Sequence, residues 1–198
     1  MKTYTVSTLN YYNSNPKNYF DRTINIDMQP SYLRFLKWLP QNTKILDAGC
    51  GVGRDSAYFI DKGFHVTALD ASEEMVKLAQ LRVNTPVLHK DFFTMNFNSE
   101  FDGVWTCASL LHISKPDLPN IFQKFTNALK TGGVWFISFK YGDVETIENG
   151  RLFSRFTISS FVEFAKQFPQ LELLEIWRSA SYEQGSENQW LQAVARKI

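Results

Sequence analysis

The chain is poor in the residues that build metal sites and disulfide frameworks. Its 198 residues include two cysteines and three histidines, and neither cysteine belongs to a CxxC pair. Structural zinc sites need several such ligands at close spacing, and disulfide-rich folds need many paired cysteines. We therefore expect no metal ion, and we interpret Cys50 and Cys107 as free thiols of a globular protein.

The sequence also lacks a strong net charge and long apolar runs. With 21 basic and 20 acidic residues, the formal net charge is +1, so the chain has no broad positive field for extended nucleic-acid contacts. No apolar run is long enough to span a bilayer, and the polar N-terminus does not resemble a secretory signal. We expect a cytoplasmic protein with no membrane contact and no extended nucleic-acid contact.

What the chain does contain is an alternation of expected strands and helices. Hydrophobic residues make up 44% of the sequence and aromatic residues 15%, which is enough for a bulky core. Short apolar runs alternate with segments of helical periodicity. The expected strands are 44–48, 64–69, 87–89, 101–106 and 133–140, and the expected helices are 32–39, 54–62, 72–81 and 117–129. Such alternation predicts a mostly parallel sheet with helices on both faces.

The last third of the chain departs from this alternation. Residues 141–155 form a polar segment that we expect to be a loop. A helix is predicted over 159–168, followed by strands over 171–177 and 190–195. A polar stretch separates these two strands, which favours an antiparallel pair at a sheet edge. No composition shift marks a domain boundary, so we expect one domain over 1–198.

A glycine-rich turn directly after the first expected strand is the most informative motif. The stretch ILDAGCGVGRDS contains Asp47, then Gly49, Gly51 and Gly53. Glycine permits positive φ and lets a ligand approach the backbone, and ligands of doubly wound sheets bind at the carboxyl ends of strands. Arg54 stands where the dinucleotide fingerprint GxGxxG requires its third glycine. That substitution disfavours a nicotinamide-dependent oxidoreductase.

Two carboxylates at strand ends indicate which ligand the turn accepts. Asp47, beside the turn, suits a cationic group such as an α-amino group better than a pyrophosphate. Asp70 ends the next expected strand, where an acidic residue can accept hydrogen bonds from both hydroxyls of a ribose. The glycines alone would indicate only a tight turn. An amino acid at one end and a ribose at the other describe S-adenosylmethionine.

The stretch ILDAGCGVGRDSAYFIDKGFHVTALDAS resembles motif I and the following acidic strand end of the class I S-adenosylmethionine-dependent methyltransferases. The resemblance continues through VLHKDFF, FDGVWTCASLLHI and LKTGGVWFISFKYG, so it covers Tyr32 to about Gly142. The outer segments are similar to bacterial small-molecule methyltransferases of the tellurite-resistance type. The resemblance implies a Rossmann-like α/β fold with a doubly wound, seven-stranded sheet, in the order 3-2-1-4-5-7-6 with an antiparallel last strand.

The resemblance also implies the cofactor S-adenosyl-L-methionine, the product S-adenosyl-L-homocysteine and a small-molecule acceptor. The candidate cofactor residues are Asp47, Gly49, Cys50, Gly51, Arg54, Asp70, Ala71, Asp91, Phe92 and Cys107. By motif position, the first glycines would hold the methionine end, Asp70 the ribose and Asp91 the adenine amino group. Three candidates have a competing interpretation: Cys50 as a packing residue, Arg54 as the partner of an acidic neighbour, and Asp91 as a solvated turn residue.

Methyl transfer from a sulfonium is an in-line displacement, so the protein mainly aligns the reactants and excludes water. His112 follows the fourth strand of the predicted sheet and is a candidate base at neutral pH. Its alternative role is to hold the loop before Pro116. Tyr19 is the second candidate catalytic residue, because residues 1–30 are expected to form an N-terminal lid over the cofactor. The alternative for the lid tyrosines is packing of the first helix on the sheet.

Residues 140–156 are expected to form a loop on the acceptor side. The candidate acceptor-binding residues are Tyr12, His112, Tyr141 and Arg151. Arg151 would meet an anionic acceptor, unless it faces solvent as most exposed arginines do. The strand end TCASLLH lacks the Asn/Asp-Pro-Pro-aromatic signature of amino-methyltransferases, which disfavours base methylation of DNA. A non-catalytic S-adenosylmethionine-binding module and the methylation of tRNA or protein remain the alternative functions.

Overall fold

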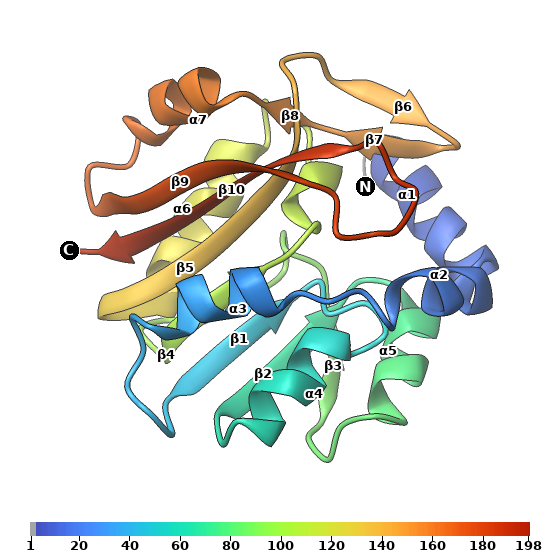
Figure 1. Cartoon of the computed structure of the whole chain (residues 1–198), viewed down its shortest axis with the longest axis horizontal. Helices are drawn as coiled ribbons and strands as arrows, with labels where there is room; N and C mark the ends of the chain where they lie inside the picture. The colour runs from blue at the N-terminus through green and yellow to red at the C-terminus, as the bar shows by residue number, and fades with distance from the viewer. Residues whose placement is uncertain (1–2) are drawn as a thin grey trace.

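A twisted central sheet organises the molecule, and helices cover both of its faces (Figure 1). The computed structural model describes residues 3–198, with side chains from Val6 onward. The strands are β1 (Lys44–Ala48), β2 (His65–Asp70), β3 (Val87–His89), β4 (Phe101–Thr106), β5 (Leu129–Tyr141), β6 (Thr146–Glu148), β7 (Arg151–Phe153), β8 (Arg155–Phe156), β9 (Leu171–Ala180) and β10 (Gln189–Lys197).

The strand order along the main sheet is β3-β2-β1-β4-β5-β10-β9, and β8 pairs with the end of β5. Strands β1 to β5 are parallel, whereas β10 is antiparallel to both β5 and β9. The chain order reverses beside β1, where β2 and β4 flank it, and ligands of doubly wound sheets bind at that point. With β9 and β10 counted as the sixth and seventh strands of the predicted sheet, this is the predicted order 3-2-1-4-5-7-6. The predicted Rossmann-like fold and its antiparallel last strand are also confirmed.

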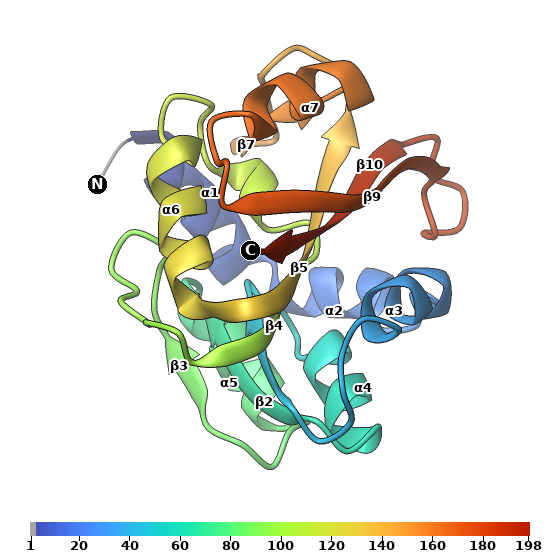
Figure 2. The same ribbon diagram turned by 90° about the vertical axis from the view of Figure 1, so that its left-hand side faces the viewer.

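The helices lie in separate layers on the two sides of the strands. They are α1 (Thr3–Ser14), α2 (Pro16–Thr23), α3 (Gln29–Leu36), α4 (Arg54–Asp61), α5 (Glu73–Gln80), α6 (Leu118–Ala128) and α7 (Ile158–Ala165), with a 3-10 turn η1 (Leu110–His112) after β4. Figure 2 shows α3 and α4 on one side of the strands and α6 on the other. In the described residues, no helix is both long and apolar enough to cross a membrane.

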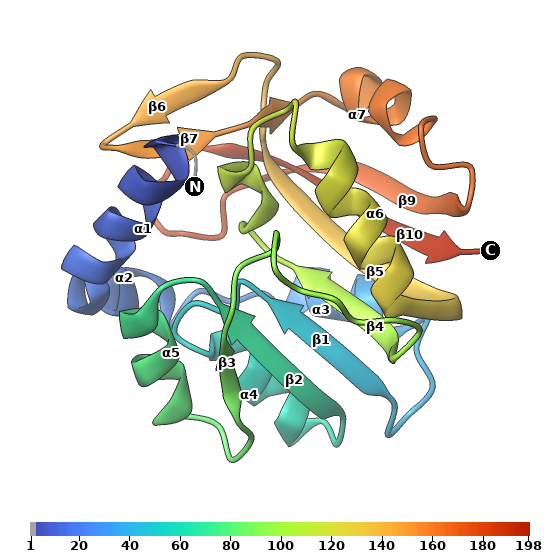
Figure 3. The ribbon, with the colours of Figure 1, turned by 180° about the vertical axis from the view of Figure 1, so that it is seen from behind.

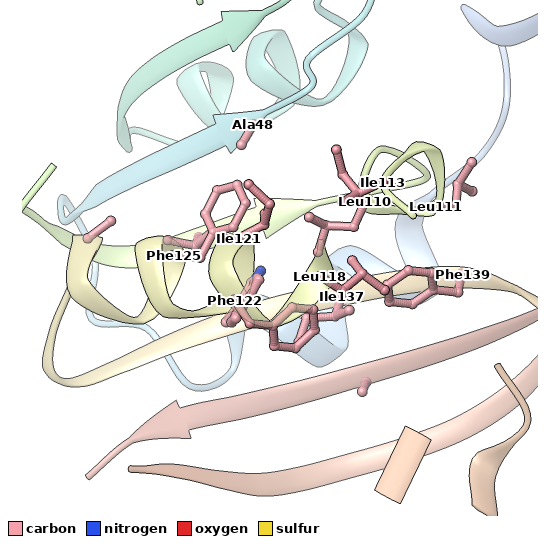
Figure 4. Close-up of a cluster of buried hydrophobic side chains, with 14 of the residues drawn as sticks. Ala48, Leu110, Leu111, Ile113, Leu118, Ile121, Phe122, Phe125, Ile137 and Phe139 are labelled. Atoms are coloured by element: carbon pink, nitrogen blue, oxygen red, sulfur yellow. The ribbon is translucent and has the colours of Figure 1, made fainter. Parts of the chain in front are cut away.

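The face covered by α6 contains the larger of the two main apolar clusters. The stripe predicted for this helix is buried, and Ile121, Phe122 and Phe125 point from α6 toward the sheet (Figure 4). The Phe122 ring lies 4.6 Å from the Trp135 ring of β5. Leu110 of η1 joins the same cluster, so packing against α6 fixes the turn that follows β4.

The opposite face is organised around Trp105 of β4, which is fully buried. Its ring stacks on Phe136 at 3.8 Å between centroids, and its Nε1 donates a 2.8 Å hydrogen bond to Asp55 at the start of α4. The same carboxylate accepts hydrogen bonds from the Tyr32 hydroxyl at 2.5 Å and from Arg54 Nε at 2.6 Å. Burial alone would raise the pKa of Asp55, but Arg54 and these donors hold it below its ordinary value. One charged group therefore joins α3, α4 and β4.

Several predicted boundaries were wrong by a few residues, and one predicted loop is structured. The helix expected over 32–39 begins at Gln29, with a proline in its first turn, and ends at Leu36. Residues 141–155, expected to be a loop, contain the β6–β7 hairpin and the first residue of β8. Asn149 and Gly150 both have positive φ, at 50° and 76°, as a type I′ hairpin turn requires. The Asn149-Gly150 pair was a signal for this hairpin that the prediction of a loop overlooked.

The N-terminal segment folds as two helices that meet at Asn15, and Pro16 stands in the first turn of α2. Seen from behind, α1 lies between α5 and the β6–β7 hairpin (Figure 3). The first two residues of the expected lid are outside the described residues. Helix α1 thus lies across the carboxyl ends of the strands, where the sequence predicts the ligand.

We expect the Asp55 cluster to be a main source of stability on the α3–α4 face. In Asp55→Ala, the buried Trp105 indole and Tyr32 hydroxyl lose their acceptor, and the free energy of unfolding should fall by about 3 kcal/mol or more. Urea denaturation followed by circular dichroism measures this change. The control is Asp61→Asn in the last turn of the same helix, where the side chain is 79% exposed. The control should change stability by less than about 0.5 kcal/mol. If the two substitutions lowered the free energy of unfolding equally, the Asp55 cluster would not be a main source of stability.

Candidate functional site

The turn after β1 needs glycine for conformation and for space. Gly49 and Gly51 have φ values of 77° and 54°, in the left-handed region that other residues rarely adopt. A Cβ on Gly49 would collide with the side chain of Ser109, and one on Gly51 would lie 3.2 Å from the Tyr19 ring. The turn therefore has a bare backbone on the side that faces these two residues.

The carboxylate of Asp70 holds this turn and the start of α5 together. Its Oδ2 accepts a 2.9 Å hydrogen bond from the backbone N–H of Gly51, and its Oδ1 accepts a 2.8 Å bond from that of Ser72. Burial raises the pKa of Asp70, although the backbone donors oppose the shift. An ionised carboxylate has about four acceptor positions. Two backbone bonds therefore leave acceptor capacity for a ligand.

A cavity of about 730 Å³ opens beside the turn, and we call it the first cavity. Six predicted cofactor residues line it: Gly49, Gly51, Asp70, Ala71, Asp91 and Phe92. Three residues predicted for catalysis or acceptor binding also line it: Tyr12, Tyr19 and His112.

Asp91 has a structural role in a turn and also lines the first cavity. Its Oδ1 accepts hydrogen bonds from the backbone N–H and the hydroxyl of Thr94, at 2.8 and 2.9 Å. The side chain therefore closes a turn after β3. It also lines the first cavity beside Phe92, at the position expected for the adenine end.

Two predicted cofactor residues, Asp47 and Cys50, line neither the first cavity nor the larger cavity next to it. Asp47 is 1% exposed and accepts a 2.5 Å hydrogen bond from the Ser56 hydroxyl. Burial and the nearby Asp55 carboxylate raise the pKa of Asp47. Cys50 packs in a small apolar cluster with Ala68, and burial raises the pKa of its thiol well above the ordinary value. Cys50 therefore has the packing environment that its alternative interpretation described.

A second cavity, of about 1040 Å³, adjoins the first. The two share four lining residues: Tyr12, Tyr19, Ala108 and His112. The second is also lined by the predicted residues Arg54, Cys107 and Arg151. Arg54 forms an ion pair with Asp55, as its alternative interpretation described. Tyr141 lines neither cavity and packs under the guanidinium of Arg178, 4.5 Å from its ring centre.

A hydrogen-bonded pair lies where the two cavities meet. The Tyr12 hydroxyl lies 2.7 Å from His112 Nε2, and His112 Nδ1 lies 2.7 Å from the carbonyl oxygen of Leu152. A carbonyl only accepts, so Nδ1 carries the proton and Nε2 accepts from the Tyr12 hydroxyl. Burial lowers the pKa of His112 to about 3 and raises the pKa of Tyr12 to about 12. Both groups are therefore neutral at pH 7.

Helix α1 is held over the cavities by polar contacts on its two sides. On the cofactor side, Asn13 Oδ1 accepts a 2.7 Å hydrogen bond from the Ser72 hydroxyl. On the other side, the Thr8 hydroxyl accepts a 3.2 Å bond from the backbone N–H of Leu152 in β7. The edge of the Tyr12 ring lies against Tyr19 of α2 at 5.2 Å. The residues expected to form a lid therefore cover the junction of the two cavities.

Sequence reasoning missed several lining residues. Ser109 and Met75 line the first cavity, and Tyr182 and Trp190 line the second. Trp190 pairs in register with Lys140, so the predicted strand order was a signal that the last strand borders the acceptor side. No local sequence pattern indicated that Ser109, Met75 or Tyr182 would line a cavity.

The chain is similar to methyltransferases in sequence and in fold. A family model described as a methyltransferase domain matches residues 45–133. YqeM of Bacillus subtilis, a candidate methyltransferase by its name, is 34% identical over 128 residues, which are 57% of this chain and 52% of YqeM. The matched residues include the glycine turn and Asp70, so this part of the chain is similar to methyltransferase domains. The chain spans about half the length of the curated relatives it matches.

Solved methyltransferases share the whole fold. The 1,6-didemethyltoxoflavin-N1-methyltransferase of Burkholderia thailandensis, solved with 1,6-didemethyltoxoflavin and S-adenosylhomocysteine, superposes with a TM-score of 0.81. It is 22% identical, and the match covers 98% of this chain and 89% of that one. A TehB-like methyltransferase of Corynebacterium glutamicum superposes with a TM-score of 0.72 at 23% identity, covering 93% and 99% of the two chains. The Corynebacterium neighbour is described as S-adenosylmethionine-dependent.

The lowered pKa of His112 makes the stability of the protein depend on pH. The pKa of His112 is lowered from 6.5 to about 3 in the folded chain, so between these values only the unfolded chain binds the proton. Its contribution to stability is complete above pH 6.5 and is lost as the pH falls toward 3. Between pH 7 and pH 5, wild type should lose about 2 kcal/mol more than His112→Gln does. Urea denaturation at both pH values measures this, and identical losses would show that His112 titrates normally.

Proposed function

We propose that this chain transfers a methyl group from S-adenosylmethionine in the first cavity to a small molecule in the second. The observation that carries the proposal is that the two cavities meet at lining residues that they share. Tyr12, Tyr19 and His112 face both spaces, so reactants held on the two sides would meet there. A binding module without catalysis would need only the first cavity.

The residues of the first cavity fit the parts of the cofactor. The remaining acceptor capacity of Asp70 would bind the ribose hydroxyls, and Asp91 with Phe92 would bind the adenine. The bare backbone at Gly49 and Gly51 would let the methionine end lie against the turn. When bound, S-adenosylmethionine supplies a methyl group on a positively charged sulfur. Asp47 lines neither cavity and its pKa is raised, so it would join the end of β1 to α4 through Ser56 rather than contact the ligand.

Tyr12 and His112 are placed to move a proton when the acceptor loses one. Tyr12 donates its proton to His112 Nε2, so its oxygen keeps lone pairs that would accept a hydrogen bond from the acceptor. The Tyr12 proton would pass to His112 as the acceptor proton passes to Tyr12. The low pKa of His112 limits this path to an acceptor group that becomes strongly acidic as it is methylated. Tyr19 would exclude water from the junction.

An enclosed acceptor space supports a small molecule. The second cavity is bounded by α2, β5, β7 and the turn before β10, and α1 lies across the junction. The Burkholderia neighbour holds a small heterocyclic compound on the same fold. Residues 1–30 would act as a lid that opens for exchange, and 140–156 would form part of the acceptor site. Methylation of a tRNA or a protein would require this cover to move aside.

The ribose assignment is tested by Asp70→Asn. The amide keeps one acceptor oxygen and cannot satisfy two backbone N–H groups and two ribose hydroxyls. We expect its affinity for S-adenosylhomocysteine, measured by calorimetry, to fall by about tenfold or more. Asp102→Asn is the matched control, because Asp102 pairs with Lys130 and lines neither cavity. Unchanged affinity in a folded Asp70→Asn protein would place the ribose elsewhere.

The proton path is tested by Tyr12→Phe with an acceptor found by following S-adenosylhomocysteine release. Loss of the hydroxyl should lower kcat by about 100-fold and change the affinity for S-adenosylhomocysteine much less. Tyr58→Phe is the matched control, because Tyr58 stacks on Tyr32 and lines neither cavity, and it should leave kcat nearly unchanged. If both substitutions have the same small effect, the Tyr12–His112 pair has no part in proton transfer.

A further inference from the structure

We propose that the acceptor is a planar aromatic or heteroaromatic anion whose negative group binds Arg151. The inference rests on the proposed function, since it names the acceptor class of the second cavity. It follows from the balance of charges in that cavity and from the chemistry of its walls.

The second cavity is lined by four cations: Arg22, Arg54, Lys140 and Arg151. Three of them have carboxylate partners in the described chain. These ion pairs are Arg22–Glu183 at 3.0 Å, Arg54–Asp55 at 2.6 Å and Lys140–Glu148 at 3.0 Å. Glu148 also pairs with Arg155, so one carboxylate is divided between two cations. The cavity wall therefore carries an excess of positive charge.

Arg151 is the cation without an ion pair among the described residues. Its guanidinium lies 4.0 Å from the centre of the Tyr11 ring and 5.1 Å from that of Phe153. The two rings hold the planar group in place, and its Nε is buried without a hydrogen-bond partner. An unused buried donor is costly, and a fixed guanidinium matches the geometry of carboxylates and similar anions. Arg151 is thus prepared to bind an anion that the chain itself does not provide.

The remaining walls favour a flat ring. Tyr12 and Tyr19 line the side of the cavity toward the first cavity, and Tyr182 and Trp190 line the second cavity from the C-terminal part of the chain. These four aromatic side chains are half-buried, so each keeps surface that a ligand ring can cover. A cationic acceptor would be repelled by the excess positive charge and by the sulfonium of the cofactor. An aromatic anion satisfies the aromatic surface and the charge together.

A matched pair of fluorescent probes tests the charge requirement without knowledge of the natural acceptor. The anionic probe is 8-anilinonaphthalene-1-sulfonate, and N-phenyl-1-naphthylamine has the same ring system without the sulfonate. Each is titrated into the full chain saturated with S-adenosylhomocysteine. We expect Arg151→Gln to weaken binding of the anionic probe by about tenfold or more and to leave binding of the neutral probe nearly unchanged. Arg151→Lys, which keeps the charge without the planar fork, should give an intermediate loss.

The control is Arg34→Gln, because Arg34 pairs with Glu175 at 3.0 Å and does not line the cavity. It should bind both probes as wild type does. A measurement on wild type alone adds a second test. Rising salt concentration should weaken binding of the anionic probe and leave binding of the neutral probe unchanged.

Two results would overturn the inference and leave the proposed function intact. One is equal binding of the anionic probe by wild type and Arg151→Gln while both bind S-adenosylhomocysteine. The other is no binding of the anionic probe by the wild-type complex. Failure of wild type to bind S-adenosylhomocysteine would instead contradict the proposed function, and the acceptor assignment would fail with it.

Discussion

The two backbone hydrogen bonds accepted by Asp70 are the constraint on which the site depends. One holds the N–H of Gly51 and so sets the course of the glycine turn. The other holds the N–H of Ser72, whose hydroxyl caps α5 and donates to Asn13 of α1. A single carboxylate at the end of β2 thus connects the sheet, the turn and the helix that covers the cavities. Its spare acceptor capacity lies where the ribose is proposed.

The division of the site into two cavities follows from this arrangement. With α1 held against α5, Tyr12 reaches His112 at the junction of the two cavities. His112 is oriented by the Leu152 carbonyl of β7, so the β6–β7 hairpin sets which ring nitrogen accepts from Tyr12. The position of α1 and of the Tyr12–His112 pair therefore depends on a few polar contacts.

The sequence predicted the parts of this structure that depend on local pattern. The alternation of strands and helices, the apolar stripe of α6 and the turn from Gly49 to Gly51 are periodic or steric signals, and they identified the sheet and most of the first cavity. The helical form of α1 could not be predicted in the same way, because its position depends on polar contacts such as Asn13 with Ser72 rather than on an apolar stripe. The part of the second cavity formed by Trp190 depends on strand order, which brings residues distant in sequence together.

A structure of the protein with S-adenosylhomocysteine bound is the most direct test of the account. The account predicts the ribose hydroxyls within hydrogen-bond distance of Asp70 and the adenine beside Phe92. It also predicts the sulfur at the junction formed by Tyr12, Tyr19 and His112. A ligand bound outside the first cavity, or with its sulfur directed away from that junction, would contradict it.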